Sequence, residues 1–243
     1  MTGVQTCALP IFVPSSRKET KTAGEPQYLD ESALTIPSVG LGRISLELTR
    51  LGELLLALVR RAPSVAMDGR LEDLQTLLGE DQEIDRLQSA ILVYIGRLSE
   101  VEHTEEEGQR MVDDAQITMN LESISDIVKT NLVSLGQQRV AEGLDLARLR
   151  DESTTQFIDA VTRNLERAIG TIGHPSASET TQVVEAKRPI EDLAAAARKS
   201  FGEKLQVADQ KDLQSFRLTT EMIEQFKQIA HLARRIAETT KEW

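Results

Sequence analysis

The sequence predicts an all-α protein made of two tandem antiparallel three-helix bundles, and three observations support this fold class. Apolar residues recur three and four positions apart along six segments, the spacing that places them on one helix face. Aromatic residues make up only 3% of the chain, which favours packing of helices on helices over packing of sheets. The six long helices fall into two sets of three with similar lengths, which indicates an internal duplication. An unrelated array of six helices would give the same six segments.

The first repeat is predicted to cover residues 38–142 and to hold three helices. Ser38 is expected to cap the first helix, and Pro63 is expected to end it, because proline lacks the backbone donor that a helix interior needs. A second helix is expected over about 68–99. The third begins with the T-x-x-E capping box at 104–107 and runs to the end of the repeat.

The second repeat is predicted to cover residues 143–243 and to follow the same plan. Its helices are expected over about 145–172, 178–205 and 209–241. Pro189 lies within the middle one and should kink it, because the ring clashes with the preceding turn.

The residues before the first repeat differ in character from the rest of the chain. Residues 1–11, "MTGVQTCALPI", fit no targeting pattern, and they can be back-translated into the end of a common short-read sequencing adapter with GTG read as the start codon. We therefore expect residues 1–11 to be an adapter-derived artefact that carries the single cysteine, Cys7. Residues 12–37 are rich in proline, serine and charge, and we expect them to be a linker that follows a missing membrane domain.

Composition excludes several classes of function. The chain has 28 Lys plus Arg against 39 Asp plus Glu, a net charge of −11, so its surface repels nucleic acid. No segment approaches the roughly 20 apolar residues that span a bilayer, which predicts a soluble domain. Phosphate-binding loops, hydrolase elbows and zinc-protease motifs are absent from the sequence, and the one E-x-x-H element, at 100–103, lacks the second that a di-iron site needs. We expect a protein that is not an enzyme.

Two pairs of carboxylates are the candidate metal ligands. Asp81 and Asp85 are four residues apart on the second predicted helix, and Glu122 and Asp126 are four apart on the third. Like charges at this spacing repel, whereas a shared divalent or trivalent cation such as Mg²⁺, Mn²⁺ or iron would stabilise them. Roughly six acidic pairs at this spacing are expected by chance in so acidic a chain. A solvated acidic face is therefore the alternative explanation.

Three stretches resemble a known family. "LESISDIVKTNL" resembles the L-E-R-I-G-D-x-x-x-N motif of PhoU proteins, and "EDQEIDRL" resembles their D-x-x-[IV]-[DN]-x-L motif. "PQYLDESALTIPSVGLGRISLELTRLGELL" resembles the entry into the PhoU-like domain of bacterial sodium-dependent phosphate cotransporters. The resemblance covers about residues 26–240, and it implies two tandem three-helix bundles that bind metal on their helix faces.

Site residues follow from this resemblance by position. In the first repeat it implies metal ligation by the two acidic pairs, Asp81, Asp85, Glu122 and Asp126, with Arg86 and Asn131 as neighbours that orient or screen the ligands. The second repeat departs from the motifs, because a lysine replaces one ligand and a glutamine replaces another. Its positions are Lys187, Glu191, Glu224, Gln228 and His231, of which Glu191, Glu224 and His231 are the weaker metal candidates.

The resemblance also implies a function. We expect a regulatory, metal-binding domain of a sodium-dependent phosphate transporter, on the cytoplasmic side of the bacterial inner membrane. Its partners would be the membrane transport domain of the same full-length chain and a second copy of itself. Two alternatives stay open: a free-standing PhoU-type adaptor in phosphate signalling, and a purely structural bundle without metal.

Overall fold

The computed structural model describes residues 24–147, 150–204 and 210–241, and the predicted adapter segment 1–11 lies outside them. All regular structure in the described residues is helical, which confirms the all-α prediction. The first repeat consists of η1 (Glu31–Thr35), α1 (Pro37–Asp68), α2 (Leu71–Leu98), α3 (Glu105–Asp126), η2 (Ile127–Leu132) and α4 (Val133–Glu142). The second consists of α5 (Glu152–Gly173), α6 (Ala177–Glu185), α7 (Lys187–Lys204) and α8 (Gln210–Thr240).

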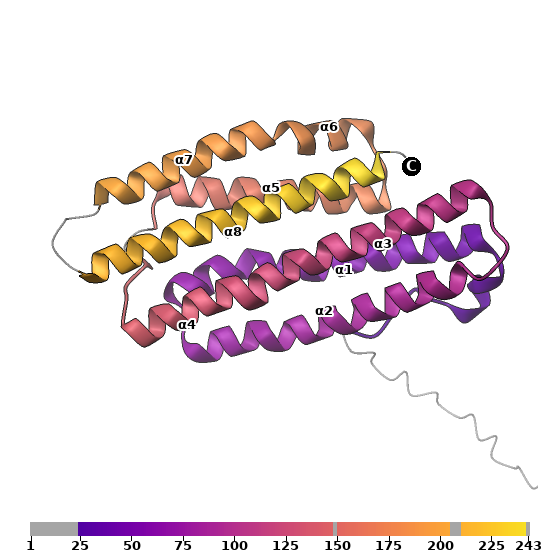
Figure 1. Ribbon diagram of the computed structural model, residues 1–243, viewed down its shortest axis with the longest axis horizontal. Helices are drawn as coiled ribbons and strands as arrows, with labels where there is room; N and C mark the ends of the chain where they lie inside the picture. Colours follow the sequence, from indigo (N-terminus) through magenta and orange to yellow (C-terminus); the bar gives the residue numbers. More distant parts are fainter. Residues whose placement is uncertain (1–23, 148–149, 205–209, 242–243) are drawn as a thin grey trace, which may run out of the picture.

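The two bundles lie side by side along a common long axis (Figure 1), with α1 and α3 of the first packed against α5 and α8 of the second. Their buried apolar residues form one continuous core. The contact between α1 and α5 is close at Gly52, where a Cβ atom would lie 2.7 Å from Cγ2 of Ile169. A larger side chain there would need Ile169 to move, so the absence of a side chain lets the two bundles approach.

Two predicted boundaries of the first helix are wrong. Helix α1 begins at Pro37 with Ile36 as its N-cap residue, so Ser38 lies inside the first turn rather than capping it. Proline is well suited to this first position because its missing N–H has no partner there in any helix. Pro63 lies inside α1, which continues to Asp68. The apolar residues after Pro63 are buried, and we attribute the continuation to that burial, which offsets one lost backbone hydrogen bond.

The start of the fourth helix was also predicted too early. Helix α5 begins at Glu152 rather than near 145, with Asp151 as its N-cap residue. Gly143 closes α4 in a left-handed conformation with φ of 60°, and the following Leu144 and Leu146 are buried although they are not part of α5. Their spacing matches that of a helix face, but both residues belong to the connection between α4 and α5, which packs on the core.

Two long helices are interrupted as they run. The third predicted helix is continuous in space, but η2 is a π-helical turn between α3 and α4, which shifts the register of the side chains that follow. The fifth predicted helix is divided at Ala186 into α6 and α7, with Pro189 in the first turn of α7. This confirms the predicted effect of Pro189.

The described part of the predicted linker is folded against the first bundle. The backbone N–H groups of Gln27 and Tyr28 donate to Oε2 of Glu47 at 2.8 and 2.6 Å, and Arg50 binds the other carboxylate oxygen of Glu47. Glu47 is fully buried, so these donors compensate its charge. Tyr94 of α2 donates to the carbonyl oxygen of Asp30 at 2.8 Å. Residues 24–36 are therefore anchored to α1 and α2.

Asp151 connects α5 to the end of α7. Its carboxylate accepts from the backbone N–H of Thr154 at 2.9 Å, from Ser200, and from the ammonium of Lys204 at 2.9 Å. Burial by itself raises the pKa of Asp151, but the hydrogen bonds from Ser200, Lys204 and Thr154 outweigh it and hold this pKa well below its ordinary value.

We predict that Asp151→Ala lowers the free energy of unfolding at pH 7 by about 1 kcal/mol, the usual effect of removing an N-cap. Because the folded-state pKa is lowered, the stabilisation is complete above the unfolded-state pKa of about 4 and is lost as pH falls through and below that value. Urea unfolding of both proteins between pH 7 and pH 2.5 measures the difference. Asp159→Ala, an exposed carboxylate on α5, is the matched control. A difference that stays constant with pH would contradict the assignment.

Candidate functional site

Asp81 is the most constrained of the predicted metal ligands. It lies on α2 between the buried Leu77 and Ile84, and it is 0% exposed. Ser125 of α3 donates its hydroxyl to Oδ1 of Asp81 at 2.7 Å. The ammonium of Lys129 lies 2.7 Å from the other oxygen, Oδ2. The buried carboxylate is thus held from the neighbouring helix, by one hydroxyl and one cation.

Lys129 binds both members of the first acidic pair. Its Nζ atom lies 2.9 Å from Oδ2 of Asp85 as well as next to Asp81. Hydrogen bonds to Asp81 and then to Asp85 raise the pKa of Lys129 above its ordinary value, so the ammonium is charged at neutral pH. Lys129 belongs to the π-helical turn η2, and this turn carries it to the carboxylates. An internal cation therefore occupies the place between Asp81 and Asp85 where the sequence predicted a metal ion.

The second acidic pair takes no part in this ion-pair cluster. Glu122 and Asp126 are both exposed on α3, and Lys129 pairs with Asp81 and Asp85 and with neither of them. Within the described residues, no three His, Cys, Asp or Glu side chains lie close enough together to hold a metal ion. As they stand, the four carboxylates do not form one ligand set. Asp81 and Asp85 have the chemistry for a hard cation, but only if Lys129 leaves them.

The two predicted neighbours have other roles. Arg86 pairs with Glu83 at 2.7 Å on the exposed side of α2, away from the buried carboxylate. The amide of Asn131 in η2 donates to Gln225 of α8. Asn131 thus connects the two repeats rather than orienting the first acidic pair.

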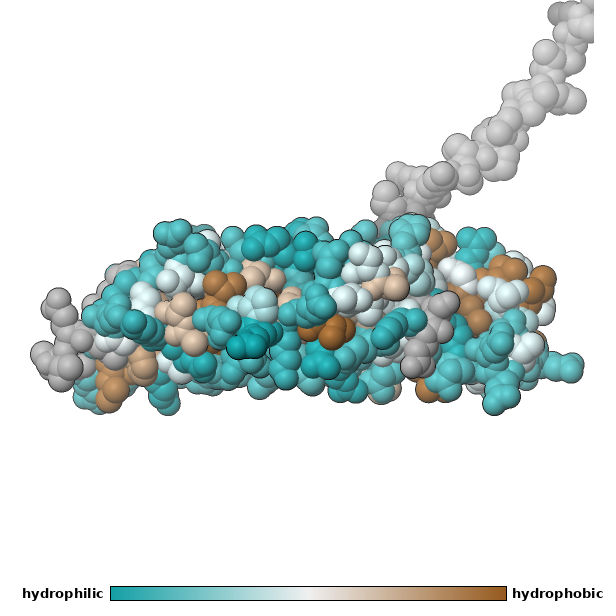
Figure 2. All heavy atoms as spheres, turned by 90° about the horizontal axis from the view of Figure 1, so that it is seen from above, coloured by the Kyte–Doolittle hydropathy of each residue, from teal (hydrophilic) through white to brown (hydrophobic). Residues whose placement is uncertain are grey.

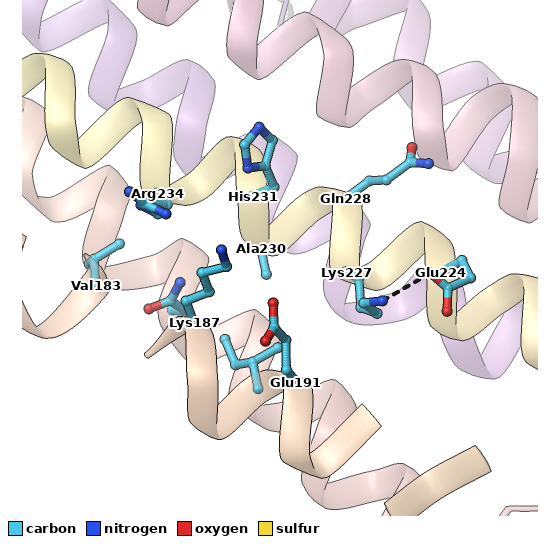
Figure 3. A pocket seen from close by; sticks show the side chains of 11 residues that line it. Val183, Lys187, Glu191, Glu224, Lys227, Gln228, Ala230, His231 and Arg234 are labelled. Atoms are coloured by element: carbon cyan, nitrogen blue, oxygen red, sulfur yellow. Dashed lines mark hydrogen bonds and ion pairs between the residues drawn. The ribbon is translucent and has the colours of Figure 1, made fainter. Parts of the chain in front are cut away.

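In the second repeat, the corresponding residues line a cavity of about 290 Å³ between α5, α6, α7 and α8. In Figure 3, Lys187 and Glu191 rise from α7 toward Ala230 of α8, whereas Gln228 and His231 point away from α7. The lining residues are Asn164, Val183, Lys187, Ile190, Glu191, Glu224, Lys227, Gln228, Ala230, His231 and Arg234. Glu224 is bound by Arg198 and by Lys227, the latter at 3.1 Å, so two cations already compensate its charge.

Sequence reasoning missed Lys129 and Asn164. Lys129 follows Asp126 by three residues within the motif that identified the second acidic pair. Its position in that motif could have indicated that it pairs with a carboxylate. The π-helical turn that aims it at Asp81 and Asp85 leaves no comparable mark in the sequence. Asn164 lies on α5, outside every motif, and only packing places it at the cavity.

Comparison with solved structures identifies the fold. The phosphate transport system regulatory protein PhoU from Streptococcus pneumoniae matches with a TM-score of 0.71 and 17% identity, over 84% of this chain and 94% of that chain. PhoU from Pseudomonas aeruginosa matches with a TM-score of 0.72 and 15% identity, over 84% of this chain and 96% of that chain. At these identities the similarity establishes a PhoU-like fold.

Comparison with curated proteins adds a link to phosphate. The "Putative inorganic phosphate export protein YjbB" of Salmonella typhimurium is 27% identical over 143 residues, which cover 59% of this chain and 25% of that protein. The protein of that name from Escherichia coli is 32% identical over 111 residues, or 46% of this chain and 20% of that protein. The match therefore spans a fifth to a quarter of the length of these relatives. No protein-family model matches the chain. Among the described helices, none is both long and apolar enough to cross a membrane.

We predict that Lys129→Met lowers the free energy of unfolding by about 1–3 kcal/mol in the absence of metal, because the buried Asp81 loses its counter-charge. Thermal or urea unfolding in the presence of EDTA measures this effect. Arg86→Met, which removes an exposed cation from the same helix as Asp81, should change stability by less than about 0.5 kcal/mol. Equal effects of the two substitutions would show that Lys129 does not compensate Asp81.

Proposed function

We propose that this chain is a PhoU-like regulatory domain that acts on phosphate transport by binding and not by catalysis. The observation that carries the proposal is the coincidence of two independent similarities. The fold matches two PhoU structures, one described as a phosphate transport system regulatory protein, and the sequence matches part of YjbB, named for inorganic phosphate export. The structural similarity and the sequence similarity thus both support a role connected with phosphate.

The parent protein that we propose is a membrane phosphate transporter coupled to sodium, with this domain on the cytoplasmic side of the bacterial inner membrane. Two observations support this part. The match covers only a fifth to a quarter of YjbB, which leaves room for a membrane domain in the relative. Residues 26–55 also resemble the entry into the PhoU-like domain of sodium-dependent phosphate cotransporters. The domain would act on the transport domain of its own chain, or through a second copy.

Metal is the proposed effector of the first repeat, in competition with Lys129. The ammonium of Lys129 and a divalent cation would bind the same two carboxylates, and the Lys129 side chain is 37% exposed, so its ammonium can move to solvent. We propose that metal binding at Asp81 and Asp85 requires this displacement. The affinity of the site would then depend on Lys129 as well as on the carboxylates.

A free-standing PhoU-type adaptor is the second candidate. One observation favours it: the chain matches 94% and 96% of the two solved PhoU chains. Sequencing the genomic DNA upstream of the Phe12 codon separates the candidates. A reading frame that runs back into apolar spans supports the transporter domain, and a start codon shortly before Pro26 supports the adaptor.

We predict that wild-type protein binds Mn²⁺ weakly and that Lys129→Met binds it at least about tenfold more tightly, since an ammonium competitor is removed. Isothermal titration of the chain with Mn²⁺ measures both affinities. Asp81→Ala combined with Lys129→Met should abolish the gain. If the single variant binds no more Mn²⁺ than wild type, the metal proposal is wrong and the first repeat is a structural ion-pair site.

For the parent protein, we predict that Asp81→Ala with Glu122→Ala changes sodium-driven uptake or efflux of radiolabelled phosphate by at least threefold at equal expression. Glu72→Ala with Glu106→Ala removes two exposed carboxylates from the same helices and serves as the matched control. If both double variants transport phosphate at the wild-type rate and hold the same metal content, these carboxylates have no regulatory role.

A further inference from the structure

The cavity of the second repeat has a small excess of cationic side chains in an acidic protein. The chain has a net charge of −11, yet the cavity lining includes Lys187, Lys227 and Arg234 against two carboxylates, Glu191 and Glu224. Its volume of about 290 Å³ is at the lower end of small-molecule sites. Four helices of one bundle surround the cavity, so the backbone positions that carry the cations are held rigidly.

In the described part of the chain, one of these cations is unpaired, and a second is paired through only part of its guanidinium group. Lys187 is exposed and makes no ion pair within the described residues. Arg234 binds Glu238 through Nε and Nη2 at 2.9 and 2.7 Å, and Nη1 takes no part in that pair. By contrast, Lys227 is engaged with Glu224. The groups that remain for a ligand, the ammonium of Lys187 and Nη1 of Arg234, thus come from α7 and α8.

Asn164 also lines the cavity, but its amide oxygen, unpaired among the described residues, is not available to a ligand. Its side chain lines the cavity from α5 and is only 3% exposed, yet its Oδ1 atom has no hydrogen-bond partner in the described part of the chain. A buried polar atom without a partner costs about 1–3 kcal/mol, and such atoms are rare in folded proteins. Less than 1 Å² of this atom is accessible, so a ligand in the cavity does not reach it.

Cations beside acceptors define the chemistry of the ligand. Lysine and arginine bind negatively charged oxygen atoms, whereas a carboxylate accepts hydrogen bonds. The ligand must therefore carry both anionic oxygens and an O–H group. Hydrogen phosphate has both at neutral pH. Sulfate has no proton, and a phosphomonoester, whose second pKa is about 6, is largely without one at pH 7.

We propose that this cavity is a binding site for inorganic phosphate. Lys187 and Nη1 of Arg234 bind its charged oxygens, and Glu191 accepts a hydrogen bond from its one hydroxyl group. This inference rests on the proposed function for its biological meaning, because a phosphate site in a regulatory domain would report the concentration of the transported ion. Its physical basis is the cavity alone.

The two repeats would then have diverged by exchanging charge at matching positions. In the first, Asp81 and Asp85 hold the cation Lys129. In the second, Lys187 stands at the position of Asp81, and His231 stands seven residues after Glu224 as Lys129 stands seven after Glu122. In the first repeat the cation, Lys129, lies on η2, the continuation of α3, whereas in the second repeat Lys187 lies on α7. The second repeat has a cavity where the first has a closed ion pair.

The test is isothermal titration of the chain with inorganic phosphate at pH 7. We expect saturable binding to one site, at least about tenfold weaker binding of sulfate, and at least about tenfold weaker phosphate binding by Lys187→Gln, since each loses one charge-assisted or buried hydrogen bond. Lys199→Gln, which removes an exposed lysine of the same helix outside the cavity, should bind phosphate as wild type does. Glu191→Gln, which replaces the proposed acceptor by an amide, should reduce the preference for phosphate over sulfate.

Three results would overturn the proposal. These are no saturable phosphate binding, equal affinity for phosphate and sulfate, and equal affinity of Lys187→Gln and wild type. Tighter binding of AMP than of phosphate would also reject inorganic phosphate and assign the cavity to phosphomonoesters. The titration uses the isolated chain and no transport assay, so its failure would leave the regulatory proposal standing, and a failed transport test would leave the binding result intact.

Discussion

The complete burial of the Asp81 carboxylate is the constraint on which the first repeat depends. A charge without solvent must be compensated by fixed partners, and here both partners come from the helix opposite, Ser125 from α3 and Lys129 from η2. This requirement fixes the position of α2 against α3 and determines where Lys129 must point. The π-helical turn meets it, because one extra residue in a turn rotates the side chains that follow.

The same turn connects the site to the second repeat. Asn131, two residues after Lys129, donates to Gln225 of α8, three residues before Gln228 and one after Glu224. The continuous core between the bundles makes this contact part of a rigid unit. Asn131 thus joins η2 to α8, the helix that supplies Lys227 and Arg234 to the cavity of the second repeat.

The surface fits a domain that works through defined sites. On the face covered by α6 and α7, hydrophobic residues are scattered among hydrophilic ones (Figure 2), and no broad apolar patch forms there. The cavity of the second repeat is lined mostly by carbon atoms, with several charged and polar groups among them. Such a lining is typical of small-molecule sites, in which a few polar groups orient the ligand.

The sequence by itself determined the helical class, the two repeats and most helices, because the spacing of Leu, Ile and Val records which face of each helix is buried. It also identified the capping box at 104–107 and the break near Pro189, both of which depend on neighbouring residues only. It failed at Pro63 and at the start of α5, where burial of distant contacts overrides a local signal. Only the tertiary structure decided the sites. It brought Lys129 to Asp81 and Asp85, left Glu122 and Asp126 exposed, and placed Asn164 at a cavity, because each of these depends on which side chains face one another across helices.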